Sequence, residues 1–226
     1  MFFLGRVMNF IQGYPSGGNL GIYDAVTALQ WVRNNIGFFG GDNTRVTIWG
    51  QSSGGMSAGL LMLSPLTDGL ISSVIMDSAP LVMAAQPCSY TEAATLRWAS
   101  QTRCASGDWN TDCLQSLTPK EVYTAVRSSG QTTLLGAPDW TNNFSPCVDG
   151  TLISAPPLAL MLQGKYKKVP VLAGFASNEA FIFTDKWKKN ISSYTDEFFE
   201  RFISKCERGF AFSQRSCCNT AQLQIR

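Results

Sequence analysis

The pentapeptide Gly50-Gln51-Ser52-Ser53-Gly54 constrains the fold of this 226-residue chain more than any other feature. It fits the pattern G-x-S-x-G, follows the apolar and β-branched run 46–49, and precedes the apolar, small-residue stretch 55–63. This order predicts a strand, a tight turn and a helix, because glycines at 50 and 54 let the backbone pack closely around a strained turn. We therefore expect the Ser52 hydroxyl to be exposed at the carboxyl end of a strand.

A strand–helix alternation surrounds this motif. Apolar residues recur at three- and four-residue spacing in 23–36, which predicts a helix that ends at Gly37. Apolar runs predict three strands, at Val46–Trp49, Val74–Met76 and Val169–Phe175. Strands that are connected through helices pair in parallel. The sequence therefore predicts a three-layer α/β fold with parallel central strands and flanking helices.

Three further helices are indicated by the residues that begin them. Ser89-Tyr90-Thr91-Glu92 fits a capping box, which predicts a helix that ends near Thr102. Thr118-Pro119-Lys120-Glu121 indicates a second start, with proline at the first helical position. Ser154-Ala155-Pro156-Pro157 opens a third helix, and Gly164 closes it.

Charge and hydropathy exclude two classes of partner. The 18 basic and 16 acidic residues are spread along the chain and form no basic stripe, so we do not expect nucleic-acid binding. No stretch approaches the ~20 apolar residues of a membrane-spanning helix. Arg6 follows the apolar residues 1–4 instead of preceding them, which is the wrong order for a signal peptide.

The seven cysteines include one pair with informative spacing. Cys104 and Cys113 flank a polar loop between two helical patterns, which favours a short disulfide loop over the alternative of two free thiols. The chain has no C-x-x-C motif and no histidine, so we expect no metal site and no cofactor. Asn143 and Asn190 begin N-x-S sequons, which favour an export pathway only weakly.

Beyond the pentapeptide, the chain resembles the type-B carboxylesterase and cholinesterase family of α/β-hydrolases. The matching segments follow the family's order, from its GN-x-G-x-x-D segment to its K-x-P signature. They are 18–24, 28–36, 39–42, 46–47, 64–65, 148–150 and 168–170. The resemblance covers roughly residues 17–184 within one partial domain, 1–226, in which 205–226 carry little pattern and are a candidate disordered tail. It implies a small-molecule ester as substrate, and with the cysteine pair it suggests the secretory pathway.

Catalytic roles are carried over only onto matching positions. The resemblance implies that Ser52 is the nucleophile and that the Ser53 backbone N–H is an oxyanion-hole donor. It implies that Glu179 is the acid that orients a catalytic histidine, although Ala180 stands where the family has glycine. Gln51 replaces the glutamate of many members, which removes a negative charge beside the nucleophile.

Two catalytic parts of the family pattern are absent. The glycine-rich oxyanion loop would precede residue 1, and the histidine would follow Thr184, where the resemblance fades. We therefore expect the chain to be the middle of a longer esterase and to be incomplete as a catalyst. Two alternatives are a non-enzymatic binding or adhesion domain, as the family also contains, and an inert fragment with an exposed sheet edge.

The aromatic residues are assigned to the core rather than to a substrate pocket. This expectation applies to Trp31, Phe38, Phe39 and Trp49. Trp98 is a candidate for lining a gorge, as is Trp109.

Overall fold

A computed structural model describes residues 18–81, 84–105, 111–128 and 145–179 of the chain. The chain divides into two compact units, Met1–Ala176 and Ser177–Arg226, and every described helix and strand belongs to the first. The tail 205–226 and Trp109 lie outside the described residues. Among the described residues, no helix combines the length and apolar character that crossing a bilayer requires.

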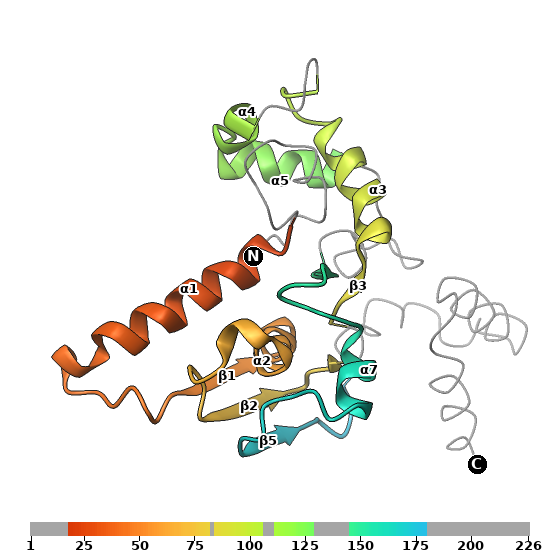
Figure 1. The fold of residues 1–226 in the computed structure, drawn as a ribbon. Coiled ribbons are helices and arrows are strands. Elements are labelled where there is room, and N and C mark those ends of the chain that lie inside the picture. Colours follow the sequence, from red (N-terminus) through yellow and green to blue (C-terminus); the bar gives the residue numbers. More distant parts are fainter. Residues whose placement is uncertain (1–17, 82–83, 106–110, 129–144, 180–226) are drawn as a thin grey trace, which may run out of the picture. The chain divides into compact units, whose positions relative to one another are not determined.

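The central sheet has three parallel strands (Figure 1), β1 (Thr47–Gln51), β2 (Ser73–Asp77) and β5 (Val171–Gly174). Their order is β1-β2-β5, so β2 is central among the described strands. Helix α2 (Ser53–Leu63) connects β1 to β2. The three predicted strands and their parallel pairing are confirmed, with ends that differ by one or two residues.

The main hydrophobic core lies between this sheet and α2. Alternate residues of β2, such as Val74 and Met76, are buried in it. Helix α2 contacts β1 and β2, while α1 (Leu20–Asn35) and α7 (Pro157–Leu162) contact α2. Helices thus pack on one face of β1 and β2, as in an α/β layer arrangement, whereas all four residues of β5 are exposed.

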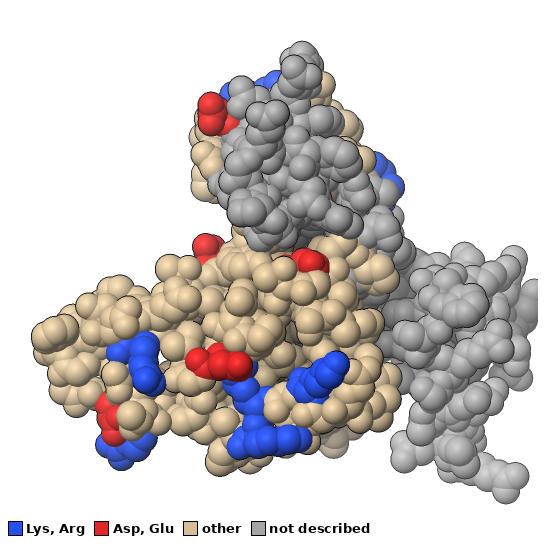
Figure 2. Space-filling view, viewed as in Figure 1, with Lys and Arg blue, Asp and Glu red and all other residues tan. Residues whose placement is uncertain are grey.

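The predicted core position of four aromatics is wrong for the described residues. Trp31, Phe38, Phe39 and Trp49 are all at least half exposed, with Phe38 at 88% and Trp49 at 71%. Trp49 alternates with the core residue Ile48 along β1, so its side chain points to the sheet face opposite α2. On the face drawn in Figure 2, much of the described surface carries no charged side chain.

Helix α1 begins earlier and stops differently than the periodicity predicts. It starts at Leu20 rather than Tyr23, and a 3₁₀ turn, Ile36–Phe39, extends it past the expected stop at Gly37. Gly40 ends the segment at φ 77°, a left-handed conformation that glycine adopts without a Cβ clash. Gly37 itself is not at positive φ, which explains why it does not terminate the helix.

A second, smaller hydrophobic cluster is formed by the segment between two short strands. Strand β3 (Gln86–Pro87) pairs in parallel with β4 (Cys147–Val148). Between them lie α3 (Cys88–Ala99), α4 (Thr111–Gln115) and α5 (Pro119–Ser128). Trp98 is 3% exposed in this cluster and so is a core residue there, not a residue lining an open gorge.

The predicted capping box at Ser89 is wrong, whereas the one at Thr118 is confirmed. Helix α3 begins at Cys88 because Pro87, with φ −55° and ψ 136°, ends β3 and leads directly into it. At α5 the Thr118 N–H donates to the Glu121 carboxylate at 2.7 Å, and the Glu121 N–H donates to the Thr118 hydroxyl at 3.3 Å. Pro156 and Pro157 likewise begin α7, and Gly164 follows its end at φ 68°.

The Thr118–Glu121 box predicts a pH dependence of stability. Hydrogen bonds from the Thr118 N–H and hydroxyl, and then one from Arg103, lower the pKa of Glu121 from 4.5 to about 2. A lowered folded-state pKa stabilises the fold above the unfolded value and loses that contribution as the pH falls toward 2. Glu121→Gln should therefore lower the melting temperature at pH 7, by an amount that shrinks between pH 4.5 and 2. The matched control is Asp24→Asn, at an exposed carboxylate on α1 outside any capping box; a deficit for Glu121→Gln that is constant with pH would contradict the prediction.

Candidate active site

Ser52 occupies the turn between β1 and α2 with unusual backbone angles. Its φ is 54° and its ψ −120°, a conformation that a residue with a side chain adopts at a cost of ~1–3 kcal/mol. Its N–H donates to the Asp77 carbonyl oxygen at 2.9 Å, and its own carbonyl accepts from the Met56 N–H. The Ser52 hydroxyl makes no capping bond to α2. The turn thus presents this hydroxyl at the carboxyl end of β1.

Close backbone approach at this turn involves Gly50 and Gly55. A Cβ on Gly50 would lie 2.2 Å from the Gly54 carbonyl carbon, and one on Gly55 would lie 2.7 Å from Ala79 Cβ. Gly54, which the motif singles out, has no atom within 4 Å of such a Cβ. The expectation that Gly54 permits the close packing is therefore wrong, and Gly55 has that role because it faces both β1 and the residues after β2.

Ser53 begins α2, which places its N–H among those without an acceptor inside the helix. The positive end of the helix dipole lies at the same place, so partial negative charge near Ser52 is stabilised there. The Ser53 side chain is exposed and Gln51 is also exposed at the end of β1. This arrangement is suited to an oxyanion next to the serine hydroxyl.

Glu179 lies in a turn that follows β5 and is exposed. It belongs to the second compact unit, whose placement relative to the first is not determined. The role of Glu179 therefore stays a prediction, which rests on β1 and β5 ending at the same edge of a parallel sheet.

Asp77 is a residue at this edge that sequence reasoning missed. It ends β2, opposite Gln51 in register, and its carboxylate accepts a 2.6 Å hydrogen bond from the Trp49 indole N–H. Its carbonyl oxygen also fixes the Ser52 backbone. Its position directly after the apolar run 74–76 was the available signal, since parallel strands gather polar groups at their carboxyl ends.

Asn19 forms a buried polar network that the sequence did not reveal. Its side-chain amide donates to the Cys147 carbonyl at 2.8 Å and to Asp149 at 2.9 Å, and its side-chain oxygen accepts from the Cys147 N–H at 2.7 Å. Asp149 also accepts from the Tyr23 hydroxyl, and burial together with this carboxylate raises the Tyr23 pKa. The network explains how two of the matching sequence segments, 18–24 and 148–150, meet in the fold.

Two disulfides occur in the described residues. Cys104 is bonded to Cys113, the pair that the sequence favoured, and Cys88 is bonded to Cys147, which the sequence did not indicate. No cluster of three metal-ligating side chains occurs in the part of the chain that the structure describes. The sequons at Asn143 and Asn190 lie outside the described residues.

The sequence profile described as "Carboxylesterase family" matches residues 12–222. The chain belongs to the carboxylesterase family. Its similarity to curated members is moderate and extends over most of its length.

Three relatives illustrate this similarity. The chain is 31% identical over 191 residues to the "Crystal protein" of Dictyostelium discoideum, and the aligned region is 83% of this chain and 34% of that protein. It is 32% identical over 195 residues to the "Fumonisin B1 esterase" of Sphingopyxis macrogoltabida, with 83% and 33% covered. It is 32% identical over 169 residues to "Liver carboxylesterase 1" of Oryctolagus cuniculus, with 73% and 30% covered. The chain thus spans about a third of the length of these relatives.

Solved structures show the same fold. A Geobacillus stearothermophilus carboxylesterase aligns with a TM-score of 0.74 at 28% identity, covering 90% of this chain and 42% of that one. A thermophilic pNB esterase aligns with a TM-score of 0.70 at 23% identity, covering 90% and 40%. The α/β-hydrolase fold expected from the sequence is confirmed, and the described residues form part of it.

Proposed function

We propose that this chain contributes the nucleophile of a carboxylic-ester hydrolase that acts through an acyl-serine intermediate. The observation that carries the proposal is the backbone of Ser52, which is held at φ 54° between β1 and α2. A strained serine at the end of a strand, with a helix N-terminus beside it, matches the requirements of a nucleophile elbow. A small-molecule ester is the substrate class that this chemistry implies.

The proposed reaction uses two described groups directly. The Ser52 Oγ attacks the ester carbonyl carbon while a base removes the hydroxyl proton, and the Ser53 N–H donates to the oxyanion that forms. The same base returns the proton to the departing alcohol, and water then hydrolyses the acyl-serine by the reverse sequence of proton transfers. Glu179 is proposed to orient and stabilise the protonated base.

We propose that the base comes from outside these 226 residues, because the chain contains no histidine. Serine is a weak nucleophile near neutral pH unless a neighbouring base activates it. We therefore propose that activity belongs to a protein in which this segment is combined with a histidine and further oxyanion donors. A purely binding or adhesive role requires no strained serine at this turn, so the geometry of Ser52 favours the hydrolase.

The test is to determine the coding sequence on both sides of the segment and to express the protein it encodes. We expect a glycine-rich segment upstream, a histidine downstream, and hydrolysis of short p-nitrophenyl esters. Ser52→Ala should reduce kcat on the order of 10⁴-fold or more, whereas Ser57→Ala, a hydroxyl bonded within α2, should reduce it by less than about tenfold. Hydrolysis that survives in Ser52→Ala would exclude Ser52 as the nucleophile.

A further inference from the structure

The two disulfides differ in their surroundings. Cys88 and Cys147 are 6% and 1% exposed, and the Asn19 side chain bonds both backbone groups of Cys147. Cys104 is also buried, whereas Cys113 is partly exposed. A thiolate that attacks a disulfide must reach one of its sulfur atoms, so access alone makes the second pair more reactive.

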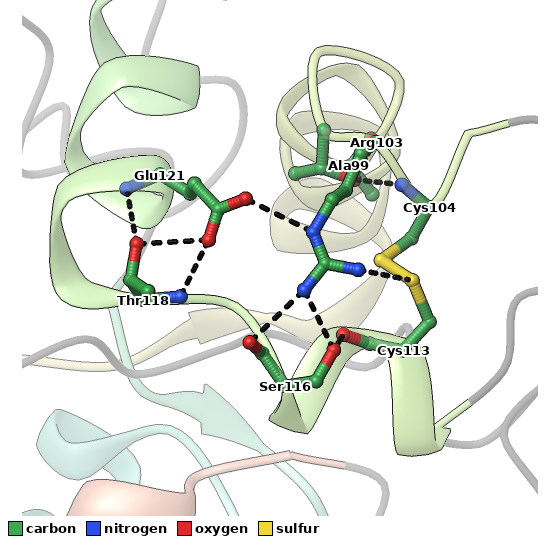
Figure 3. Close-up of polar contacts among 8 residues, drawn as sticks. Ala99, Arg103, Cys104, Cys113, Ser116, Thr118 and Glu121 are labelled. Atoms are coloured by element: carbon green, nitrogen blue, oxygen red, sulfur yellow. Dashed lines mark hydrogen bonds and ion pairs between the residues drawn. A yellow bond between two sulfur atoms is a disulfide. The ribbon is translucent and has the colours of Figure 1, made fainter.

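Arg103 adds a charge effect to this difference in access. Its guanidinium Nη1 lies 3.8 Å from the Cys113 sulfur (Figure 3), and it is held there by 2.8 and 3.0 Å hydrogen bonds from Nη2 to Ser116. Glu121 offsets part of the positive charge, since it pairs with the Arg103 Nε at 2.9 Å. A neighbouring cation stabilises a thiolate, and stabilising the reduced form makes a disulfide easier to reduce.

The helix that Cys113 anchors is too short to persist alone. Helix α4 has five residues, Thr111–Gln115, well below the ~12–15 residues at which isolated helices become marginally stable. The disulfide to Cys104 joins it covalently to the chain that follows α3. Helix α5, by contrast, has its own capping box and contacts α3.

We propose that Cys104–Cys113 is a redox-sensitive link that opens before Cys88–Cys147 and releases α4 while the α/β core stays folded. A dithiol is the reductant: its thiolate attacks the Cys113 sulfur, the sulfur–sulfur bond breaks and Cys104 leaves as a thiolate. The second thiol of the reductant then displaces Cys113. Cys113 also leaves as a thiolate, so one dithiol is oxidised to its disulfide and two cysteines are reduced; the two protons that the dithiol gives up protonate these thiolates or pass to solvent, according to the pH.

The first experiment measures the order of reduction in the folded chain. Free thiols, including any at Cys206, Cys217 and Cys218, are blocked with N-ethylmaleimide, and the chain is then incubated at pH 8 with graded dithiothreitol and treated with iodoacetamide. Peptide mass spectrometry should find Cys104 and Cys113 alkylated at lower dithiothreitol than Cys88 and Cys147. Simultaneous alkylation of all four cysteines, or the reverse order, would overturn the proposal.

Substitution of Arg103 separates the charge effect from a structural one. Arg103→Gln should lower the equilibrium constant for reduction of Cys104–Cys113 about fivefold, equal to about 20 mV for this two-electron couple, and Arg103→Lys should retain most of the wild-type value. A purely structural role predicts the opposite sign, because loss of the Ser116 and Glu121 contacts would loosen the loop and ease reduction. Arg45→Gln is the matched control, since Arg45 pairs with Asp42 on the surface and should leave the constant unchanged.

Hydrogen exchange tests the structural consequence. After selective reduction and alkylation, the Ser116 and Leu117 amides, which donate to the Asp112 and Leu114 carbonyls of α4, should lose protection, while the amides of α2 and β2 should exchange as before. Unchanged protection of these two amides, or equal loss in α2, would refute the release of α4. None of these measurements involves ester hydrolysis, so their outcome does not depend on the proposed function.

Discussion

The 226-residue chain alone should hydrolyse p-nitrophenyl acetate no faster than its Ser52→Ala variant. Loss of the histidine of a serine-hydrolase triad costs on the order of 10⁶ in kcat, and loss of one oxyanion donor costs roughly 10²–10³ more. The chain has no histidine to remove the Ser52 proton, and Glu179 then has no imidazole to orient. The Ser53 N–H remains, but by itself it stabilises an oxyanion that is seldom formed.

The measurement combines steady-state hydrolysis with labelling by a fluorophosphonate, read by intact mass. Turnover that depends on Ser52 in this chain would refute the prediction and would require another base, such as a lysine. A further experiment adds imidazole as an external base. If the turn at Ser52 is folded, fluorophosphonate labelling of Ser52 should rise with the imidazole concentration, after subtraction of the labelling found in Ser52→Ala. Absence of labelling even at high imidazole would argue against an accessible Ser52 hydroxyl.

The parts of the fold that the sequence predicted are those determined by local patterns. The apolar runs that became β1, β2 and β5 are recognisable because strands of parallel sheets are rich in consecutive apolar residues, although in this chain only β2 has fully buried residues and all of β5 is exposed. The Thr118–Glu121 box is recognisable because its donors and acceptors are four residues or fewer apart. The turn at Ser52 was recognisable for the same reason, since strand, turn and helix are contiguous in sequence.

The features that were missed depend on contacts across long sequence separations. Cys88 and Cys147 are 59 residues apart, and Asn19 reaches Cys147 across 128. Contacts between residues this far apart produce no periodic pattern in the amino-acid sequence. For the aromatic residues, the sequence predicted burial that the structure does not show. Trp49 is apolar and lies in a strand, but it is exposed. Its burial would depend on which element covers its side of the sheet, and composition does not specify that.

The turn that holds Ser52 should be most sensitive to a methyl group at Gly50. In Gly50→Ala the added Cβ would lie 2.2 Å from the Gly54 carbonyl carbon and 2.6 Å from the Gly55 nitrogen, and all of these are backbone atoms that cannot rotate away. Relief requires β1 and α2 to separate, which disrupts the main core. We expect destabilisation by more than ~4 kcal/mol in urea unfolding, or failure to fold.

Gly54→Ala is the matched control for that substitution, because it adds the same methyl group four residues away where no atom lies within 4 Å. Position 54 is helical and not at positive φ, so alanine should be neutral or stabilising by up to about 1 kcal/mol. The stability of Gly55→Ala should lie between those of the Gly50 and Gly54 variants. Adding Ala79→Gly to Gly55→Ala should relieve the contact of the new methyl group with residue 79, but not its 2.8 Å contact with the Gly50 carbonyl oxygen. Equal stability of the Gly50 and Gly54 variants would show that β1 and α2 do not approach as closely as this turn requires, and would remove the geometric basis for assigning Ser52 as a nucleophile.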